Sequence, residues 1–143
     1  MINKILSILL IINILNGEVI RDDENYVVFD TASKLMWQDN NDAIFNKYTW
    51  ESAISYCEDL NFSGHTDWRL PNINELYTLV DFTKTELVIN SKFTNIKNSR
   101  YWTSSSAKLN LSNGWYIDFT NGSSAYQVKS STTTLTRCVR DIN

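Results

Sequence analysis

The sequence predicts an α+β fold, in which short antiparallel strands precede and follow two helices along the chain. Alternating apolar and polar residues indicate strands, most clearly over residues 114–119. Apolar residues that recur at spacings of three and four over residues 50–60 indicate a helix. The order of strands, two helices and strands again is typical of α+β proteins rather than of a parallel α/β sheet.

The size and composition of the chain favour one globular domain. It has 143 residues, of which 13% are aromatic, including five tryptophans and seven tyrosines. A chain of this length can bury a substantial core, and its aromatic content argues against disorder. Four glycines, one proline and the lack of an internal repeat exclude collagen-like and low-complexity chains.

Residues 1–17 predict a signal peptide. Lys4 precedes an apolar stretch over residues 5–15, and Gly17 supplies a small residue at the expected cleavage site. The apolar stretch is too short to span a bilayer but suits secretion. Leu15 is a poor residue for cleavage, so a retained N-terminal anchor is the alternative. We expect residues 18–143 to be a single exported domain, periplasmic, cell-surface or secreted, with no membrane span after cleavage.

The exported part should begin with two strands, over residues 26–30 and 35–38, joined by a turn. A polar loop, residues 39–42, follows. Its carboxylates could hold Ca²⁺, but their spacing lacks the alternating ligands and the glycine of an EF-hand loop. We interpret this loop as a solvated turn.

The first helix is predicted to begin after Thr49, whose hydroxyl suits an N-cap. Its buried face is expected to carry Trp50, Ala53, Ile54, Cys57 and Leu60.

A rigid corner is predicted to lead into the second helix. Pro71 fixes φ and suits the position just before a helix. Asn72 is then the expected N-cap, and Glu75 completes a capping box. Trp68 is expected in the core and Arg69 in an internal ion pair, with stacking on a sugar and anion binding as the respective alternatives.

The second helix is predicted over residues 73–81, and residues 83–99 are predicted to be a long polar loop. Asn121-Gly122 is a favoured hairpin turn. The C-terminal strands are expected over residues 101–106, 114–119, 125–129 and 134–140. Trp102 and Trp115 are expected to be core residues of these strands, but stacking on a sugar is the alternative, and Trp102 is kept as a ligand candidate.

The two cysteines, Cys57 and Cys138, predict one disulfide between the first helix and the last strand, since exported proteins favour such bonds. It would close a loop of about eighty residues and contribute about 4–5 kcal/mol by the chain-entropy relation. A free nucleophilic cysteine needs a nearby base, and nothing in the sequence places the sole histidine, His65, beside either cysteine.

Charge is distributed unevenly. Residues 18–81 carry 13 acidic and 4 basic side chains, whereas residues 82–143 carry 3 acidic and 8 basic ones. An exported, acidic chain without a basic run is not expected to bind nucleic acid. The basic second half predicts a surface for an anionic polymer, with solvated lysines as the alternative. The candidate ligand-binding residues are Lys92, Lys97, Arg100, Lys108 and Trp102. Arg137 and Arg140 are expected to pair with internal acids, for which Glu75 and Asp67 are the candidates, with binding of sulfate or carboxylate as the alternative.

Six short motifs occur in order along residues 26–141. They are Leu35-Met-Trp-Gln38, Trp50-Glu-Ser-Ala53, Asp67-Trp-Arg-Leu-Pro-Asn72, Tyr101-Trp-Thr-Ser-Ser105, Trp115-Tyr-Ile-Asp-Phe119 and Arg137-Cys-Val-Arg140. Together they resemble the domain at the C-terminus of bacterial collagen-like adhesins, the Lcl C-terminal domain, formerly a domain of unknown function. One departure is the turn at residues 31–35, where the family commonly has a glycine.

This resemblance implies a C-type-lectin-like fold, related to that of formylglycine-generating enzymes, with a bridge from the first helix to the last strand. For the collagen-like members of the family, the resemblance also implies attachment to sulfated polysaccharide and assembly as trimers. This chain has no collagen repeat, so neither property transfers to it automatically. Formylglycine-generating activity needs reactive cysteines beyond the structural pair, and none is spare. The carboxylate ligands of calcium-dependent lectin sites are missing around Pro71 and Trp115.

The sequence therefore predicts an exported, non-catalytic binding or adhesion module that uses no cofactor or metal. Its expected partner is a surface glycan, including an anionic polysaccharide, or an envelope protein. The alternative is a structural or assembly component of a larger cell-envelope complex. A homo-oligomer is compatible with either.

Overall fold

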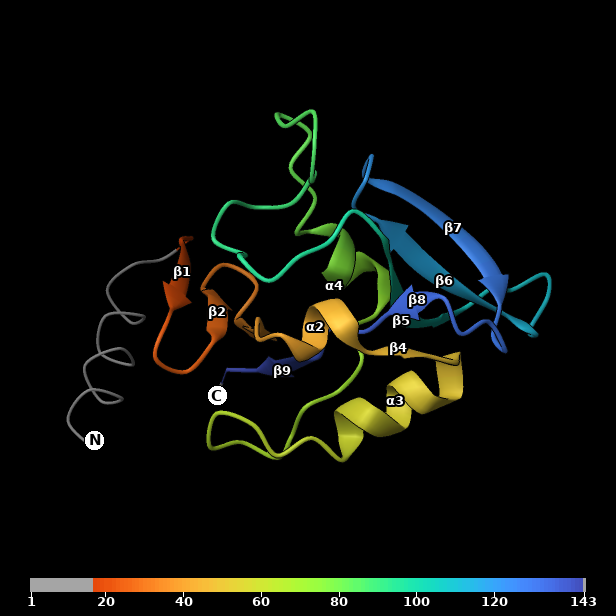
Figure 1. Cartoon of the computed structure of the whole chain (residues 1–143), viewed down its shortest axis with the longest axis horizontal. Coiled ribbons are helices and arrows are strands. Elements are labelled where there is room, and N and C mark those ends of the chain that lie inside the picture. The colour runs from red at the N-terminus through yellow and green to blue at the C-terminus, as the bar shows by residue number, and fades with distance from the viewer. Residues whose placement is uncertain (1–16, 143) are drawn as a thin grey trace.

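The computed structural model describes residues 17–142 (Figure 1), so the predicted signal peptide lies outside the described residues except for Gly17. Within this range the chain forms an α+β fold with two sheets and three short helices, α2 (Asp42–Phe45), α3 (Trp50–Glu58) and α4 (Ile73–Tyr77). None of the described helices is long and apolar enough to cross a membrane.

The first sheet has the strand order β1-β2-β3-β9 and is antiparallel throughout. Its strands are β1 (Val19–Asp22), β2 (Val27–Asp30), β3 (Leu35–Gln38) and β9 (Val139–Asp141). The bounds of β3 are those expected from the sequence, whereas β1 was not predicted. Trp37 in β3 lies opposite Val139 in β9, which brings the start and the end of the domain together.

The second sheet has the strand order β4-β8-β5-β6-β7. Its strands are β4 (Lys47–Tyr48), β8 (Thr134–Leu135), β5 (Arg100–Ser106), β6 (Asn113–Asp118) and β7 (Ser123–Val128). Helices α3 and α4 cover opposite faces of it, since Trp102 packs in one buried cluster with Ala53 of α3 and Tyr101 in another with Leu76 of α4. Strand β7 lies at the free edge, on the right in Figure 1.

The predicted single strand over residues 134–140 is wrong, because this segment crosses from one sheet to the other. Thr134 and Leu135 form β8 in the second sheet, and Val139 begins β9 in the first. Between them, Arg137 and Cys138 have fully buried side chains that fix the crossing through an ion pair and a disulfide. Alternation along a strand reveals which face a residue occupies but not which sheet it joins.

Two local predictions also differ from the structure. Helix α4 ends at Tyr77 rather than at residue 81, and Val80 instead forms a bridge with Ile89. The loop at residues 39–42 is only partly solvated: Asn41 and Asp42 are exposed, but the side chain of Asp39 is fully buried and α2 begins at Asp42. Charged partners from distant segments account for the burial of Asp39.

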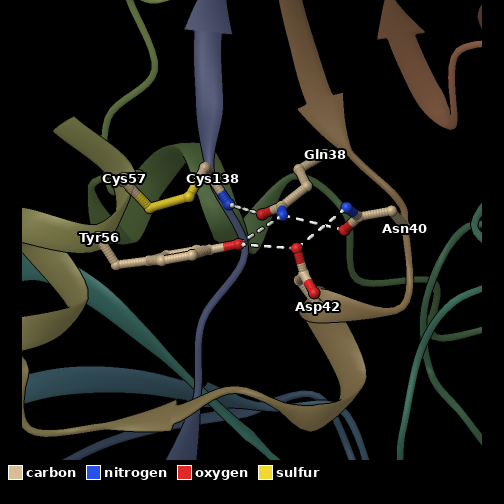
Figure 2. The surroundings of a disulfide bond; sticks show 6 residues. All are labelled: Gln38, Asn40, Asp42, Tyr56, Cys57 and Cys138. Carbon is tan, nitrogen blue, oxygen red and sulfur yellow. Dashed lines mark hydrogen bonds between the residues drawn. A yellow bond between two sulfur atoms is a disulfide. The ribbon is translucent and has the colours of Figure 1, made fainter. Parts of the chain in front are cut away.

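The predicted disulfide between Cys57 and Cys138 is present and joins α3 to the residue before β9 (Figure 2). A polar network surrounds it. The side-chain oxygen of Gln38 accepts the backbone N–H of Cys138, and its amide nitrogen donates to the hydroxyl of Tyr56, at 2.9 Å. This network satisfies polar groups that burial would otherwise leave without partners.

Candidate functional site

A pocket of about 470 Å³ lies where the first turn of α4 meets the connection between β5 and β6. We call it the Trp115 pocket. Its lining residues are Ile73, Ser105, Ser106, Ala107, Lys108, Leu109, Asn110, Trp115 and Tyr126.

Two aromatic side chains form one side of this pocket. Trp115 in β6 lies directly opposite Tyr126 in β7, and their ring centroids are 5.2 Å apart in a T-shaped arrangement. Residues directly opposite in an antiparallel pair point to the same face, so the register of the hairpin brings the two rings together. Tyr126 is 52% exposed and Trp115 is half-buried, so both offer surface to a ligand.

The predicted corner positions another part of the lining. Asn72 and Glu75 form the capping box that begins α4, with the backbone N–H of each bonded to the side chain of the other. Ile73, the first residue of α4, lines the pocket, and its backbone N–H donates to the hydroxyl of Ser105 at 3.1 Å. The backbone N–H of Ser104 donates to the carbonyl of Pro71, which ties the corner to β5.

Polar groups line the rest of the pocket. Ser105, Ser106 and Asn110 supply hydroxyl and amide groups, and Lys108 is the one charged residue among the lining residues. Leu109, also among the lining residues, is fully exposed. The pocket thus combines aromatic rings, small hydrogen-bonding groups and one cation, without an acidic side chain.

This combination suits the binding of a small polar ligand that has an apolar face. Trp and Tyr offer flat apolar surface with a polar tip, and a few polar groups fix the orientation of a ligand in such a pocket. The sole histidine, His65, lies outside the lining, in the segment before the corner, where it is bridged to Phe62. The hydroxyl of Ser106 accepts a hydrogen bond from the ammonium group of Lys129 at 2.8 Å.

The predicted ligand-binding cations are not gathered at this pocket. Lys108 lines it, but Lys97 packs over the ring of Phe45, 4.5 Å from its centroid. Arg100 begins β5 and Lys108 comes two residues after the end of this strand, which separates them by roughly 25 Å at the rise of a strand. Lys92 is exposed in the loop after α4.

The structure corrects the assignment of Trp102 to the ligand set. Its side chain is 0% exposed, and its Nε1–H donates to the carbonyl of Tyr48 at 2.9 Å. Trp68 is a core residue as expected, with its Nε1–H bonded to the carbonyl of Phe62. Trp115, expected in the core, instead lines the pocket.

The arginines near the C-terminus are engaged internally. The buried guanidinium of Arg137 donates to the carboxylate of Asp39 at 2.7 Å, and Arg140 binds Asp67 through two nitrogens. Burial alone would raise the pKa of Asp39, but Arg137, the N–H of Thr94 and other donors outweigh it and lower this pKa. These two arginines therefore add no cationic surface.

Arg69, in the corner, is also paired internally. It forms two parallel hydrogen bonds with Glu75, both at 2.8 Å, and a third with Asp141 at 3.0 Å. The bond to Glu75 is the largest cause of the raised pKa of Arg69. This arginine links the corner to β9 and does not line the Trp115 pocket.

Among residues 17–142, no cluster of three or more His, Cys, Asp or Glu side chains is arranged to hold a metal ion. In the loop considered for Ca²⁺, the carboxylate of Asp39 is bound by Arg21 and Arg137. Its oxygens are therefore already occupied by donors.

Residues 26–140 match the family model described as the Lcl C-terminal domain, close to the residues 26–141 expected from the motifs. No curated protein matches the chain significantly.

Proposed function

The chain belongs to the Lcl C-terminal domain family, which is associated with bacterial collagen-like adhesins, and we propose that it is a non-catalytic module that binds a surface glycan in the Trp115 pocket. The disulfide between Cys57 and Cys138, together with this family, indicates an extracytoplasmic domain. Export through the predicted signal peptide is part of the proposal.

The observation that carries the proposal is the pair formed by half-buried Trp115 and exposed Tyr126 beside hydroxyl and amide groups. A sugar ring has an apolar face of C–H groups and a rim of hydroxyls. The aromatic rings can pack against that face while Ser105 and Asn110 bond the hydroxyls, and such directed bonds set the orientation of a ligand.

Lys108 gives the pocket a preference among glycans. It is the one charged residue in the lining, and no acidic residue there opposes it. A sugar that bears a carboxylate or a sulfate would gain a charge-assisted hydrogen bond from the ammonium group. We therefore extend the proposal to an anionic polysaccharide, held by Lys108 rather than by a broad basic surface.

We also propose that the fold is C-type-lectin-like. The covalent bridge from α3 to the residue before β9 supports this, because the first long helix and the last strand are the elements such a bridge joins in that fold.

The second candidate function is that of an assembly component in the cell envelope. Several apolar side chains next to the pocket are exposed, and such patches mark protein interfaces. They are Leu109, Leu111 and Val128.

A glycan array tests the proposal, with Tyr126→Ala and Trp115→Ala compared with the wild-type chain. Tyr26→Ala is the matched control, because Tyr26 is 53% exposed against 52% for Tyr126 but lies in the turn before β2, outside the pocket. We expect saturable binding that the two pocket variants lose and the control keeps. No saturable binding by a folded wild-type chain, together with a specific partner in envelope extract, would favour the assembly role.

A further inference from the structure

We propose that strand β7 is the docking edge for a second copy of this chain, and that two copies pair along it, antiparallel, into one continuous sheet. This goes beyond glycan binding, because it concerns the free edge of the second sheet. It does not depend on the ligand of the Trp115 pocket.

Strand β7 lacks the features that protect sheet edges. It pairs with β6 over six consecutive residues without a register shift, and its sequence Ser-Ser-Ala-Tyr-Gln-Val contains no charge, proline or glycine. Exposed edges usually carry charges, prolines or bulges, because an unprotected edge invites another strand. The edge of the first sheet at β1 carries Arg21 and Asp22, and β4 has only two residues.

The backbone of β7 presents hydrogen-bonding groups to this edge. The backbone N–H of Lys129 donates to the carbonyl of Ser112 in the hairpin partner. Antiparallel ladders alternate, so Gln127 and Ala125 also bond toward β6, while Ser124, Tyr126 and Val128 direct their N–H and C=O groups outward. A strand placed beside β7 would meet them.

A second copy suits this edge because β7 can pair with β7 of another copy that runs in the opposite direction. Centred on Tyr126, an antiparallel pair sets Tyr126 opposite the partner's Tyr126 and Ser124 opposite the partner's Val128. No like charges meet along an uncharged strand. The same register sets Lys129, the charged residue that follows β7, opposite the partner's uncharged Ser123, so it meets no like charge there either.

The pairing also covers apolar surface. Tyr126 and Val128 project to the same face and are about half exposed, and Leu111 lies beside the end of β7 because its neighbour Ser112 bonds Lys129. A two-fold axis through the sheet at Tyr126 would bring these side chains of both copies onto one face. The two Trp115 pockets would then open on the same side of the assembly.

The mass of the full chain in solution tests the proposal, measured by light scattering or sedimentation over a concentration series. We expect a dimer for the wild-type chain and a monomer for Ser124→Lys, because the lysines would stand in the edge-to-edge interface. Ser91→Lys, in an exposed loop far along the chain, is the matched control and should stay dimeric. Neither serine lines the Trp115 pocket.

A disulfide crosslink tests the register proposed for the two β7 strands. Tyr126→Cys should form a disulfide between two copies under mild oxidation, since the two residues meet at the axis, whereas Ser91→Cys should not. A wild-type chain that stays monomeric at every concentration, or a dimer that survives Ser124→Lys, would overturn the proposal. An extended segment of another protein would then be the better occupant of the edge.

Discussion

Asp39 and Arg137, 98 residues apart in the sequence, form an ion pair with 2.7 Å between Oδ1 and Nη1, and neither side chain reaches solvent. The pair joins an acid of the first half to a base of the second. Arg140 and Asp67 also join the two halves, although the side chain of Asp67 is 54% exposed. The opposite charges of the two halves therefore partly neutralise each other in the folded chain.

Replacing Asp39 by Asn should destabilise the domain by about 3–5 kcal/mol, because Arg137 would remain buried without its anion. Denaturant unfolding of both proteins at neutral pH measures the difference. A loss below about 1 kcal/mol would show that the pair is of little consequence for stability.

The same pair predicts a pH dependence. The pKa of Asp39 is lowered in the folded chain, so its contribution is fully present above the pKa of an unfolded Asp, near 3.9. It is lost as the pH falls below that value. Unfolding free energies measured between neutral pH and strong acid should therefore fall less steeply for Asp39→Asn than for the wild-type chain. Parallel curves would contradict this role.

Removing the disulfide by replacing Cys57 and Cys138 with Ala should lower stability by about 4–5 kcal/mol, an upper figure from the entropy of a loop of about eighty residues. The reduced wild-type chain should likewise unfold at a lower melting temperature than the oxidised chain. Equal melting temperatures for both forms would mean that the bridge does not stabilise the fold.

Trp68→Ala should cost about 3–5 kcal/mol, since it removes a buried aromatic side chain from the core. Trp115→Ala should cost much less, because Trp115 is half-buried at the pocket. Denaturation of both variants compares the two positions directly. If Trp68→Ala unfolded like the wild-type chain and lost ligand binding instead, Trp68 would be a binding residue.

Lys108→Ala should weaken binding of an anionic glycan, and that binding should itself fall as salt rises, because Lys108 is exposed and screened. The comparison is a triple variant with Ala at Lys92, Lys97 and Arg100, which the structure places outside the pocket. Titrations of both variants with the glycan at two salt concentrations measure the loss of affinity and its dependence on salt. A larger loss in the triple variant would favour the broader basic surface predicted from the sequence.

Local features of this fold follow from the sequence because they depend on neighbouring residues. The capping box of Asn72 and Glu75 needs only residues three apart, and alternation suffices to find the strand of Trp115. The role of Trp115 could not be predicted in the same way. It depends on the register that sets Tyr126 opposite it and on how far α4 extends over the sheet.

The long-range partner of Arg137 escaped prediction, whereas Glu75 and Asp67, the acids expected to pair with arginines, do so with Arg69 and Arg140. An arginine with the pattern of a strand residue, such as Arg137, gives no sign of which acid it will meet, and Asp39 looks like a loop residue. The crossing between sheets at residues 136–138 depends on that pairing. The disulfide was an exception, because two cysteines allow only one intramolecular bond.

The most direct test of glycan binding in the Trp115 pocket is an NMR titration of the five tryptophan indole N–H signals with an oligosaccharide selected on the array. The indole signal of Trp115 should shift saturably, while those of the buried Trp37, Trp68 and Trp102 should stay in place. Saturable binding that leaves the Trp115 signal unmoved, with shifts instead at Lys92, Lys97 and Arg100, would contradict the assignment of the pocket as the binding site.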